Sequence, residues 1–291
     1  MNHAEQQNRE QIARDVRRMW HESALYWDKH RATIAAMFAP LTRALIEGAQ
    51  IGKGQTVLDV GGGAGDPSLT VAEIVGPSGL VTCTDPIKEM LDAAEGEAQR
   101  RAIANIKFQQ CAAESLPFQN DQFDAAVARL SAMFFADPPA ALREMLRVVK
   151  AGGRISFVVW APPEVNPLFQ IITDVVERYL PSPPPDLDAP GAFRFAEPGK
   201  LGNLLSAAGA VQINEQLLQF RIKADVPLTK FWTMRSELSD TLREKVKKLS
   251  SEQLARIEQE VAAAARPFFE NDRMDFPAAA IVVTGRKPNG R

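Results

Sequence analysis

The sequence has few cysteines and histidines and no long apolar segment. Its 291 residues include only two Cys and three His. Cys83 and Cys111 fall in or at the end of predicted strands without a metal-ligand spacing, so we expect buried, reduced thiols and no metal site. No uninterrupted apolar run exceeds the length of Ala278 to Val283, far below the ~18 residues that indicate a membrane span. With a polar N-terminus that has no signal segment, a cytoplasmic protein is expected.

An excess of one charge is also missing. Lys and Arg number 34, and Asp and Glu number 36. A protein whose main partner is nucleic acid shows a basic excess, so we expect no such partner. The 45% hydrophobic and 24% charged fractions are ordinary for a globular chain and exclude a disordered or fibrous one. The length fits one large domain or two small ones at ~100–200 residues each.

What the chain does contain is a glycine-rich turn within the segment Val57–Pro67, VLDVGGGAGDP. Apolar residues around Asp59 predict a buried parallel strand. Gly61, Gly63 and Gly65 follow it and carry no Cβ atom that would keep a ligand away from the backbone. We therefore expect a nucleotide-binding turn, with a helix that begins near its end.

The spacing of this turn separates two ligand classes. Dinucleotide folds use Gly-x-Gly-x-x-Gly, and Asp66 stands where the third glycine would be. A carboxylate there repels a pyrophosphate, whereas Asp59 and Asp66 attract an ammonium and a sulfonium. A cationic adenosyl ligand is favoured. An NAD-dependent oxidoreductase remains the alternative enzyme, and a purely structural glycine turn remains an alternative for the motif.

Predicted strands and helices alternate along the chain. The strands are expected at 57–60, 80–84, 106–109, 123–128, 154–160, 211–222 and 278–284. The helices are expected at 10–47, 69–75, 86–101, 140–149, 167–179, 198–208 and, as two or more, 226–272. Such alternation implies crossover connections and a parallel sheet covered on both faces.

Four segments resemble those of one enzyme family. They are Asp59 with its glycines, Cys111–Phe118 ending in Leu-Pro-Phe, Phe123-Asp124, and Ala141–Arg154. Together they resemble the class I methyltransferases that use S-adenosylmethionine (SAM). The resemblance covers about 50–160 and the closing strand, and the local style is similar to small-molecule branches near the quinone and polyketide enzymes. It implies SAM as donor, S-adenosylhomocysteine (SAH) as product, and a small, apolar or aromatic acceptor methylated on oxygen or carbon.

The expected fold follows from both arguments. It is α/β, a Rossmann-like and mainly parallel seven-stranded sheet with helices on both faces, an antiparallel last strand, an N-terminal helical arm and helical cap insertions. The expected division is an arm over 1–50, a core over 51–160, 197–225 and 275–291, and cap insertions over 161–196 and 226–274. A helical cover at the carboxyl ends of the strands would enclose a reacting centre. A homo-oligomer is possible.

The cofactor residues implied beyond the glycine turn lie at three later strand ends. Asp85 ends the second strand and would accept from both ribose hydroxyls, or cap the next helix. Ile87 would pack on the adenine or in the core. Where the family has an aspartate that accepts from adenine, this chain has an alanine, so recognition would fall to the Ala113 N–H, with Glu114 or a water as acceptor. Arg129 would meet the cofactor carboxylate, the substrate or a structural ion-pair partner.

Acceptor residues are harder to choose. Methyl transfer from a sulfonium depends mainly on positioning, and a base is optional. His30 is the candidate base, with Tyr26 and Trp27 beside it on the arm. The expected substrate wall consists of Phe134, Phe135, Trp160, Asn166, Phe169 and Phe231. Packing roles remain open for all of these residues, and a SAM-binding regulatory module without transferase activity remains a second alternative.

Overall fold

The sheet places its parallel strands at the centre and one antiparallel strand near the edge. In the computed structural model, which describes residues 3–184 and 186–290, the strands are β1 (Thr56–Val60), β2 (Leu80–Asp85), β3 (Ile106–Gln110), β4 (Phe123–Arg129), β5 (Val149–Trp160), β6 (Val211–Ala224), β7 (Phe269–Glu270) and β8 (Arg273–Arg286). Their order is β3-β2-β1-β4-β5-β8-β6, with β7 paired to β8. β1 to β5 pair in parallel, and β8 is antiparallel to β5 and β6. The expected α/β fold with an antiparallel last strand is confirmed.

The central strands are held by burial. Val57 and Leu58 of β1 and Ala126 and Val127 of β4 are fully buried, as expected for strands with helices on both faces. Each fully buried Val or Leu side chain contributes roughly 1.5–3 kcal/mol. This rigid centre fixes the positions of the turns that follow β1, β2 and β4.

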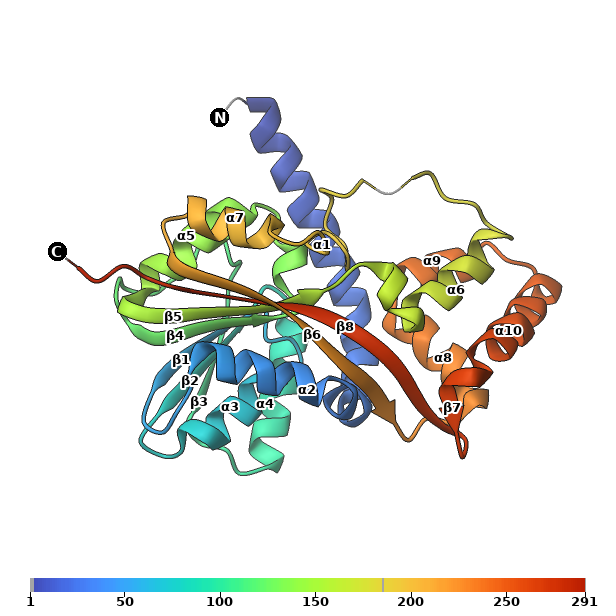
Figure 1. The fold of residues 1–291 in the computed structure, drawn as a ribbon, viewed down its shortest axis with the longest axis horizontal. Coiled ribbons are helices and arrows are strands. Elements are labelled where there is room, and N and C mark those ends of the chain that lie inside the picture. Colours follow the sequence, from blue (N-terminus) through green and yellow to red (C-terminus); the bar gives the residue numbers. More distant parts are fainter. Residues whose placement is uncertain (1–2, 185, 291) are drawn as a thin grey trace.

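Helices cover both faces of the sheet. They are α1 (His3–Lys29), α2 (Arg31–Ala49), α3 (Ser68–Val75), α4 (Lys88–Arg100), α5 (Pro138–Val148), α6 (Pro167–Glu177), α7 (Lys200–Ala207), α8 (Leu228–Leu238), α9 (Asp240–Val246) and α10 (Ser251–Ala265). Figure 1 shows α2, α3 and α4 on one side of the strands and α5 and α7 on the other.

The last strand is longer than its apolar segment predicts. β8 begins at Arg273 and runs through Pro277, where a proline lacks the N–H that a ladder needs. It pairs with β6 at Pro277, whereas its pairing with β5 starts only at Ala280. Pro277 therefore lies where one side of β8 has no pairing to β5, a position that tolerates proline.

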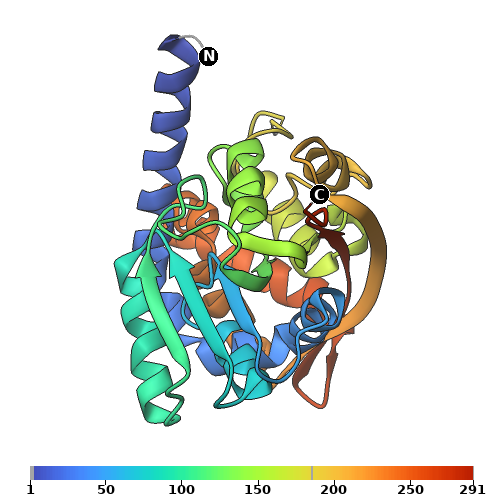
Figure 2. The same cartoon turned by 90° about the vertical axis from the view of Figure 1, so that its left-hand side faces the viewer.

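The N-terminal helical segment breaks at His30 into two helices with different roles. α2 packs on β4, β5, β6 and β8, so it belongs to the layered body. α1 contacts α4, α8 and α9, and its first turns project beyond the body (Figures 1 and 2). α10 packs on α6 and α8, and α8 packs on α9. The inserted helices therefore form one group, which contacts the sheet directly through α6 and β8 and contacts α4 and α2 through α1. The division into arm, core and cap stays a prediction.

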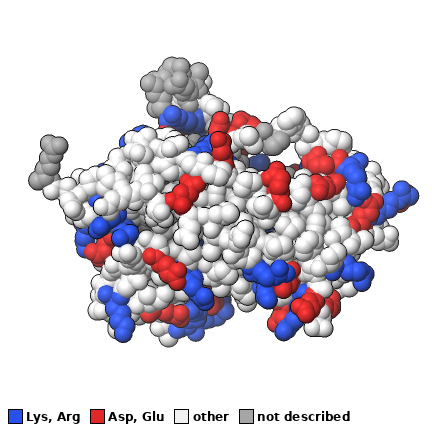
Figure 3. Space-filling model, in the orientation of Figure 1, with Lys and Arg blue, Asp and Glu red and all other residues white. Residues whose placement is uncertain are grey.

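The surface is mixed in charge. On the face in Figure 3, Lys and Arg side chains lie among Asp and Glu side chains, in keeping with the formal net charge of −2. None of the described helices combines the length and apolarity that crossing a membrane requires.

Candidate functional site

A cavity with about 900 Å³ of empty volume lies where the turns after β1, β2 and β4 meet the arm. We call it the glycine-loop cavity. Its lining residues are Val16, Trp20, Trp27, Arg31, Ile34, Phe38, Gly61, Gly62, Gly63, Ala64, Asp66, Asp85, Pro86, Met90, Arg129, Leu130, Ser131, Phe134 and Phe135. The carboxyl ends of parallel strands are the usual ligand position in such sheets, so this cavity is the candidate ligand site.

The glycine loop presents bare backbone to this cavity. Gly61 and Gly63 have φ of +72° and +55°, a region that favours glycine. The Gly61 and Gly62 N–H groups donate to the Thr84 carbonyl at 2.8 and 2.9 Å, which ties the loop to β2. A Cβ on Gly63 would meet no atom within 4 Å. A ligand can therefore approach the backbone at Gly63 directly.

Asp85 lies beside the loop at the end of β2 and lines the cavity. Its Oδ2 accepts from the Gly63 N–H at 3.0 Å and its Oδ1 from the Ile87 N–H at 2.9 Å. Burial raises the pKa of Asp85 from 3.8 to about 7, although these two hydrogen bonds act to lower the pKa. Each oxygen retains acceptor capacity, which suits a pair of ligand hydroxyls.

Asp59 lies beneath the loop and does not line the cavity. It is fully buried, and its Oδ2 accepts from the Ser68 hydroxyl at 2.5 Å. A Cβ on Gly62 would stand 2.8 Å from the same oxygen. Burial raises the pKa of Asp59 from 3.8 to about 6. Asp59 therefore supports the loop from behind, and any influence on a ligand passes through the loop backbone.

Arg129 and Asp66 form an ion pair in the wall of the cavity. Arg129 Nη1 donates to Asp66 Oδ2 at 2.6 Å and to the Thr42 hydroxyl at 2.6 Å, and Nη2 donates to the Asp66 carbonyl at 2.8 Å. The structural ion pair left open for Arg129 is thus present. Both residues line the cavity. The cavity wall therefore carries an acidic and a basic group, which would suit a zwitterionic ligand.

The arm closes the cavity with residues that sequence reasoning missed. Arg31 donates to the carbonyls of Ala64 and Ala93, the latter at 2.8 Å, and so clamps the glycine loop to α4. Trp20 packs edge-on against Trp27 at 5.3 Å between centroids. The Trp27 Nε1 is buried without a hydrogen-bond partner. Helical spacing could have placed Trp20 on the same face as Trp27, but no local signal marks Arg31 as a clamp.

Besides Asp59, four predicted cofactor residues do not line either cavity described here. Gly65 packs against α4, where a Cβ would be 3.1 Å from the Ala94 Cβ. Ile87 is buried in a small cluster with Met90, and Met90 reaches the cavity instead. Ala113 is buried in the main core.

Glu114 points elsewhere as well. Its Oε1 accepts from the N–H groups of Ala136 and Asp137 at 2.7 and 3.1 Å. This carboxylate therefore fixes the turn before α5. Glu114 lines neither cavity, so the structure gives it a role in the fold, and its acceptor role toward a ligand stays a prediction.

A second cavity, with about 1000 Å³ of empty volume, lies under the inserted helices. We call it the cap cavity. Its lining residues are Met19, Trp20, Ser23, Trp27, Ile34, Met37, Phe38, Leu130, Met133, Phe134, Trp160, Phe169, Pro190, Gly191, Ala192, Arg235, Leu238, Ser239, Asp240 and Thr241. The two cavities share six of these side chains, namely Trp20, Trp27, Ile34, Phe38, Leu130 and Phe134. They therefore adjoin across one apolar and aromatic wall.

The predicted substrate residues divide between this wall and the interior. Trp27 and Phe134 line both cavities, and Trp160 and Phe169 line the cap cavity, where their rings pack edge-on at 5.0 Å. Phe231 is instead stacked on Phe276 in the core.

Asn166 and Tyr26 line neither cavity. The Asn166 amide donates to the carbonyls of Ala161 and Ala279 at 3.0 Å, and its Oδ1 accepts from the Ala279 N–H at 3.0 Å. The expected substrate role of Asn166 is therefore corrected to an anchor between β5 and β8, because its polar atoms are used. The Tyr26 ring lies under the Arg243 guanidinium at 5.1 Å.

His30 also lies outside both cavities. Its Nε2 is 2.6 Å from Glu237 Oε2, and Lys29 binds the same carboxylate at 2.7 Å. The imidazole thus joins the break between α1 and α2 to α8. This position replaces the expected catalytic base with a contact between arm and cap.

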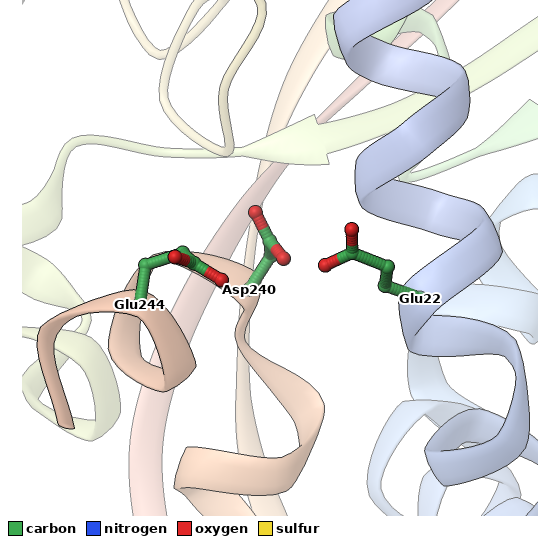
Figure 4. Close-up of side chains that lie close together, drawn as sticks. All are labelled: Glu22, Asp240 and Glu244. Carbon is green, nitrogen blue, oxygen red and sulfur yellow. The ribbon is translucent and has the colours of Figure 1, made fainter. Parts of the chain in front are cut away.

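Three carboxylates gather beside the cap cavity. Glu22 of α1 and Asp240 and Glu244 of α9 have oxygen atoms within 4.8 Å of one another (Figure 4). Each has a cationic partner, with Arg18, Arg243 and Lys247 at 3.4, 3.2 and 2.5 Å respectively. These ion pairs account for the cluster. We assign no ion to it.

Comparison with known proteins gives one family. The model of the ubiE/COQ5 methyltransferase family matches residues 6–182. The chain is 41% identical over 112 residues to the uncharacterized methyltransferase YcgJ of Bacillus subtilis, covering 37% of this chain and 42% of that one. It is 33% identical over 155 residues to the ubiquinone/menaquinone biosynthesis C-methyltransferase UbiE of Pseudomonas putida, covering 53% and 60%. The chain spans about half the length of these curated relatives.

Solved structures agree on the fold. The crystal structure of YcgJ from Bacillus subtilis superposes with a TM-score of 0.54 at 25% identity, covering 86% of this chain and 98% of that one. A methyltransferase structure from Bacillus halodurans superposes with a TM-score of 0.55 at 21% identity, covering 85% and 99%. The arrangement of sheet and helices is therefore that of known methyltransferase structures.

Proposed function

Since the chain belongs to the ubiE/COQ5 methyltransferase family of class I SAM-dependent methyltransferases, we propose that it methylates a small, apolar or aromatic metabolite held in the cap cavity. SAM is the cofactor that this family uses. The observation that supports the proposal most is that the two cavities share six lining residues and so adjoin. A donor in one cavity would then lie beside an acceptor in the other. Methylation on oxygen or carbon is proposed.

The glycine-loop cavity has groups that fit the ribose and the amino-acid end of SAM. The open position at Gly63 would let the ligand approach the backbone, and Asp85 would accept from the ribose hydroxyls. Asp66 would face the ammonium or sulfonium, and Arg129 the carboxylate. The unpartnered Trp27 N–H is a further donor at this wall. The residue set is therefore complementary to a cationic, zwitterionic nucleoside, while Asp66 would repel a pyrophosphate.

Methyl transfer from SAM needs little chemical assistance from protein side chains. SAM supplies a methyl carbon already activated by the sulfonium. The acceptor atom forms a bond to that carbon, the electron pair of the broken carbon–sulfur bond stays on sulfur to give SAH, and any acceptor proton passes to water. The residues lining the two cavities include no histidine, cysteine or tyrosine. Orientation and exclusion of bulk water by the aromatic wall would then supply most of the rate.

The inserted segments would determine which acceptor binds. The segments 161–196 and 226–274 contribute Phe169, Pro190–Ala192, Arg235 and Leu238–Thr241 to the cap cavity. The shared wall comes instead from α1, α2 and the segment after β4. We therefore propose that the core and arm hold the donor and that the cap sets acceptor specificity. This assigns a function to each part of the predicted division.

Methyl-labelled SAM tests the proposed activity. The full chain is incubated with labelled SAM and a panel of phenols, hydroquinones and polyketide-like enols, and label is followed into an extractable acceptor. Asp85→Asn serves as the donor-site control, and a heat-denatured sample as the blank. The proposal is supported if at least one acceptor is labelled by the wild-type chain and is not labelled by Asp85→Asn. SAH binding with label in no acceptor would instead favour a regulatory SAM-binding module.

A further inference from the structure

Arg235 is a buried cation in an otherwise apolar part of the cap cavity. Arg235 lies on α8 and is 8% exposed. It lines the cap cavity but not the glycine-loop cavity. Its guanidinium carbon lies 4.9 Å from the centre of the Phe169 ring. Its Nε is buried without a hydrogen-bond partner. Within residues 3–184 and 186–290, no carboxylate or other acceptor lies in hydrogen-bond range of Arg235. The Phe169 ring is therefore the one group there that interacts with its charge.

This arrangement is unfavourable for the free protein. Burial lowers the pKa of Arg235 to about 10, so the side chain still carries its charge at neutral pH. A buried charge without a partner destabilises a fold, and contact with one aromatic face offsets only part of that cost. The neighbouring α8 residues Phe231, Trp232 and Met234 are buried and apolar. An apolar residue would satisfy packing at position 235, so the charge points to a ligand.

The one acidic residue in the described lining of the cap cavity is already engaged. Asp240 also lines the cap cavity, but its carboxylate accepts from Arg243 Nη2 at 3.2 Å. Arg243 does not line the cavity. Among the described residues, Arg235 is the one Lys or Arg that does so. Since Asp240 is held by Arg243, Arg235 is the one unpaired charge in this described lining, which is mainly aromatic and aliphatic. One unpaired positive charge matches one negative charge on an apolar molecule.

We propose that Arg235 binds a carboxylate of the methyl acceptor, so that the substrate is an apolar or aromatic acid. The inference rests on the proposed function, and it names the class of its acceptor. The planar fork of a guanidinium pairs with a carboxylate through two parallel hydrogen bonds. A phosphate would need more than one cation, whereas a monoanion is balanced by Arg235 alone. Arg235 lines only the unshared part of the cavity, so it anchors the acid while another atom of the acceptor faces the donor.

Matched acids and amides test this assignment. Benzoate, 2-naphthoate and decanoate are each compared with their primary amides by isothermal titration to the full chain saturated with SAH. We expect at least one acid to bind tenfold or more tightly than its amide. In Arg235→Gln the acid should lose this preference, and in Arg235→Lys it should keep part of it. Arg256→Gln is the control, because Arg256 is exposed on α10 and paired with Glu252.

Two further measurements keep the outcomes separate. SAH titration of each variant without acid tests the donor site, so failure of SAH binding in the wild type counts against the proposed function and not against Arg235. Melting temperatures show whether Arg235→Gln folds, and the wild-type and Arg235→Lys comparisons do not depend on that variant. If no acid in the panel binds more tightly than its amide, or if Arg235→Gln folds and keeps the preference, the proposal is overturned.

Discussion

The Gly63 N–H donates to Asp85 Oδ2 at 3.0 Å, and this bond joins the turn after β1 to the end of β2. The same carboxylate accepts from Ile87 through its other oxygen. Two backbone donors thus fix its orientation while the residue still lines the glycine-loop cavity. This contact makes the shape of the loop and the charge of Asp85 depend on one another.

Ligand affinity should therefore depend on pH. The pKa of Asp85 is about 7 in the folded protein and 3.8 for the ordinary side chain. Between these values the folded chain holds a proton that the unfolded chain has lost, so this group lowers stability as pH rises through that window. Ribose hydroxyls favour the ionised carboxylate, so binding releases the proton. We expect SAH affinity to rise about tenfold from pH 6 to pH 8, measured by calorimetric titration.

Asp85→Asn is the control for this profile. An amide would place its own N–H groups against one of the two backbone donors, so the variant should bind SAH weakly at every pH. Its affinity should be flat across the same range. A pH-independent affinity in the wild-type chain would show that ligand binding is not coupled to Asp85.

A methyl group at Gly63 should interfere with the ligand and not with the fold. Gly63→Ala and Gly76→Ala both place Cβ in open space on a backbone with positive φ, +55° and +68°. Each should lose about 1–3 kcal/mol of stability from that conformation. Gly63→Ala should in addition weaken SAH binding at least tenfold, whereas Gly76→Ala, at the end of α3, should leave it unchanged. Equal SAH affinities for the two variants would contradict the proposed approach of the ligand.

His30→Gln should leave turnover nearly intact. The imidazole is 2.6 Å from Glu237 and lies outside both cavities, so it has no path to an acceptor proton. Removal of a general base costs typically 10²–10⁴-fold in rate. We expect kcat within about threefold of the wild type, a bound well below that range, and a small loss of thermal stability from the weakened arm–cap contact. A hundredfold fall in kcat with a normal melting temperature would restore His30 as the base.

Asn166→Ala should damage stability and not substrate binding. The side-chain amide bonds four backbone groups, namely the carbonyls of Ala161, Pro162 and Ala279 and the N–H of Ala279, and so connects the loop after β5 to β8. Each buried polar group left without a partner costs about 1–3 kcal/mol. Urea unfolding should show a loss of at least about 2 kcal/mol, with KM for any acceptor unchanged in the folded fraction. Full stability together with a raised KM would place Asn166 in the substrate wall after all.

The sequence predicts the core of this fold well because its signals are local. Apolar strands such as Thr56–Val60, the glycine turn and Asp85 at a strand end predict the sheet and the candidate donor site. The alternation of strands and helices gives the layers. The sequence predicts β8 only from residue 278, because Pro277 interrupts the strand after the alternating segment Arg273–Phe276. The proline is tolerated because it pairs with β6 and lies beyond the β5 pairing.

The site residues that sequence reasoning missed are defined by contacts between distant segments. Arg31 is recognised as a clamp only when α2 lies over the loop at Ala64 and over α4. Arg235 stands in the apolar stretch Phe231–Arg235, a signal that could have been noticed, but its lack of a partner is visible only in three dimensions. His30 and Asn166 were chosen by type and position, and tertiary contacts use both for structure.

Parallel titration of the full chain with SAH and with NAD, at pH 8 and with the same protein sample, tests the central claim most directly. The account predicts saturable binding of SAH at one site per chain, weakened in Gly63→Ala, and no saturable binding of NAD, because Asp66 lies where a pyrophosphate would be held. Saturable binding of NAD without binding of SAH would contradict it.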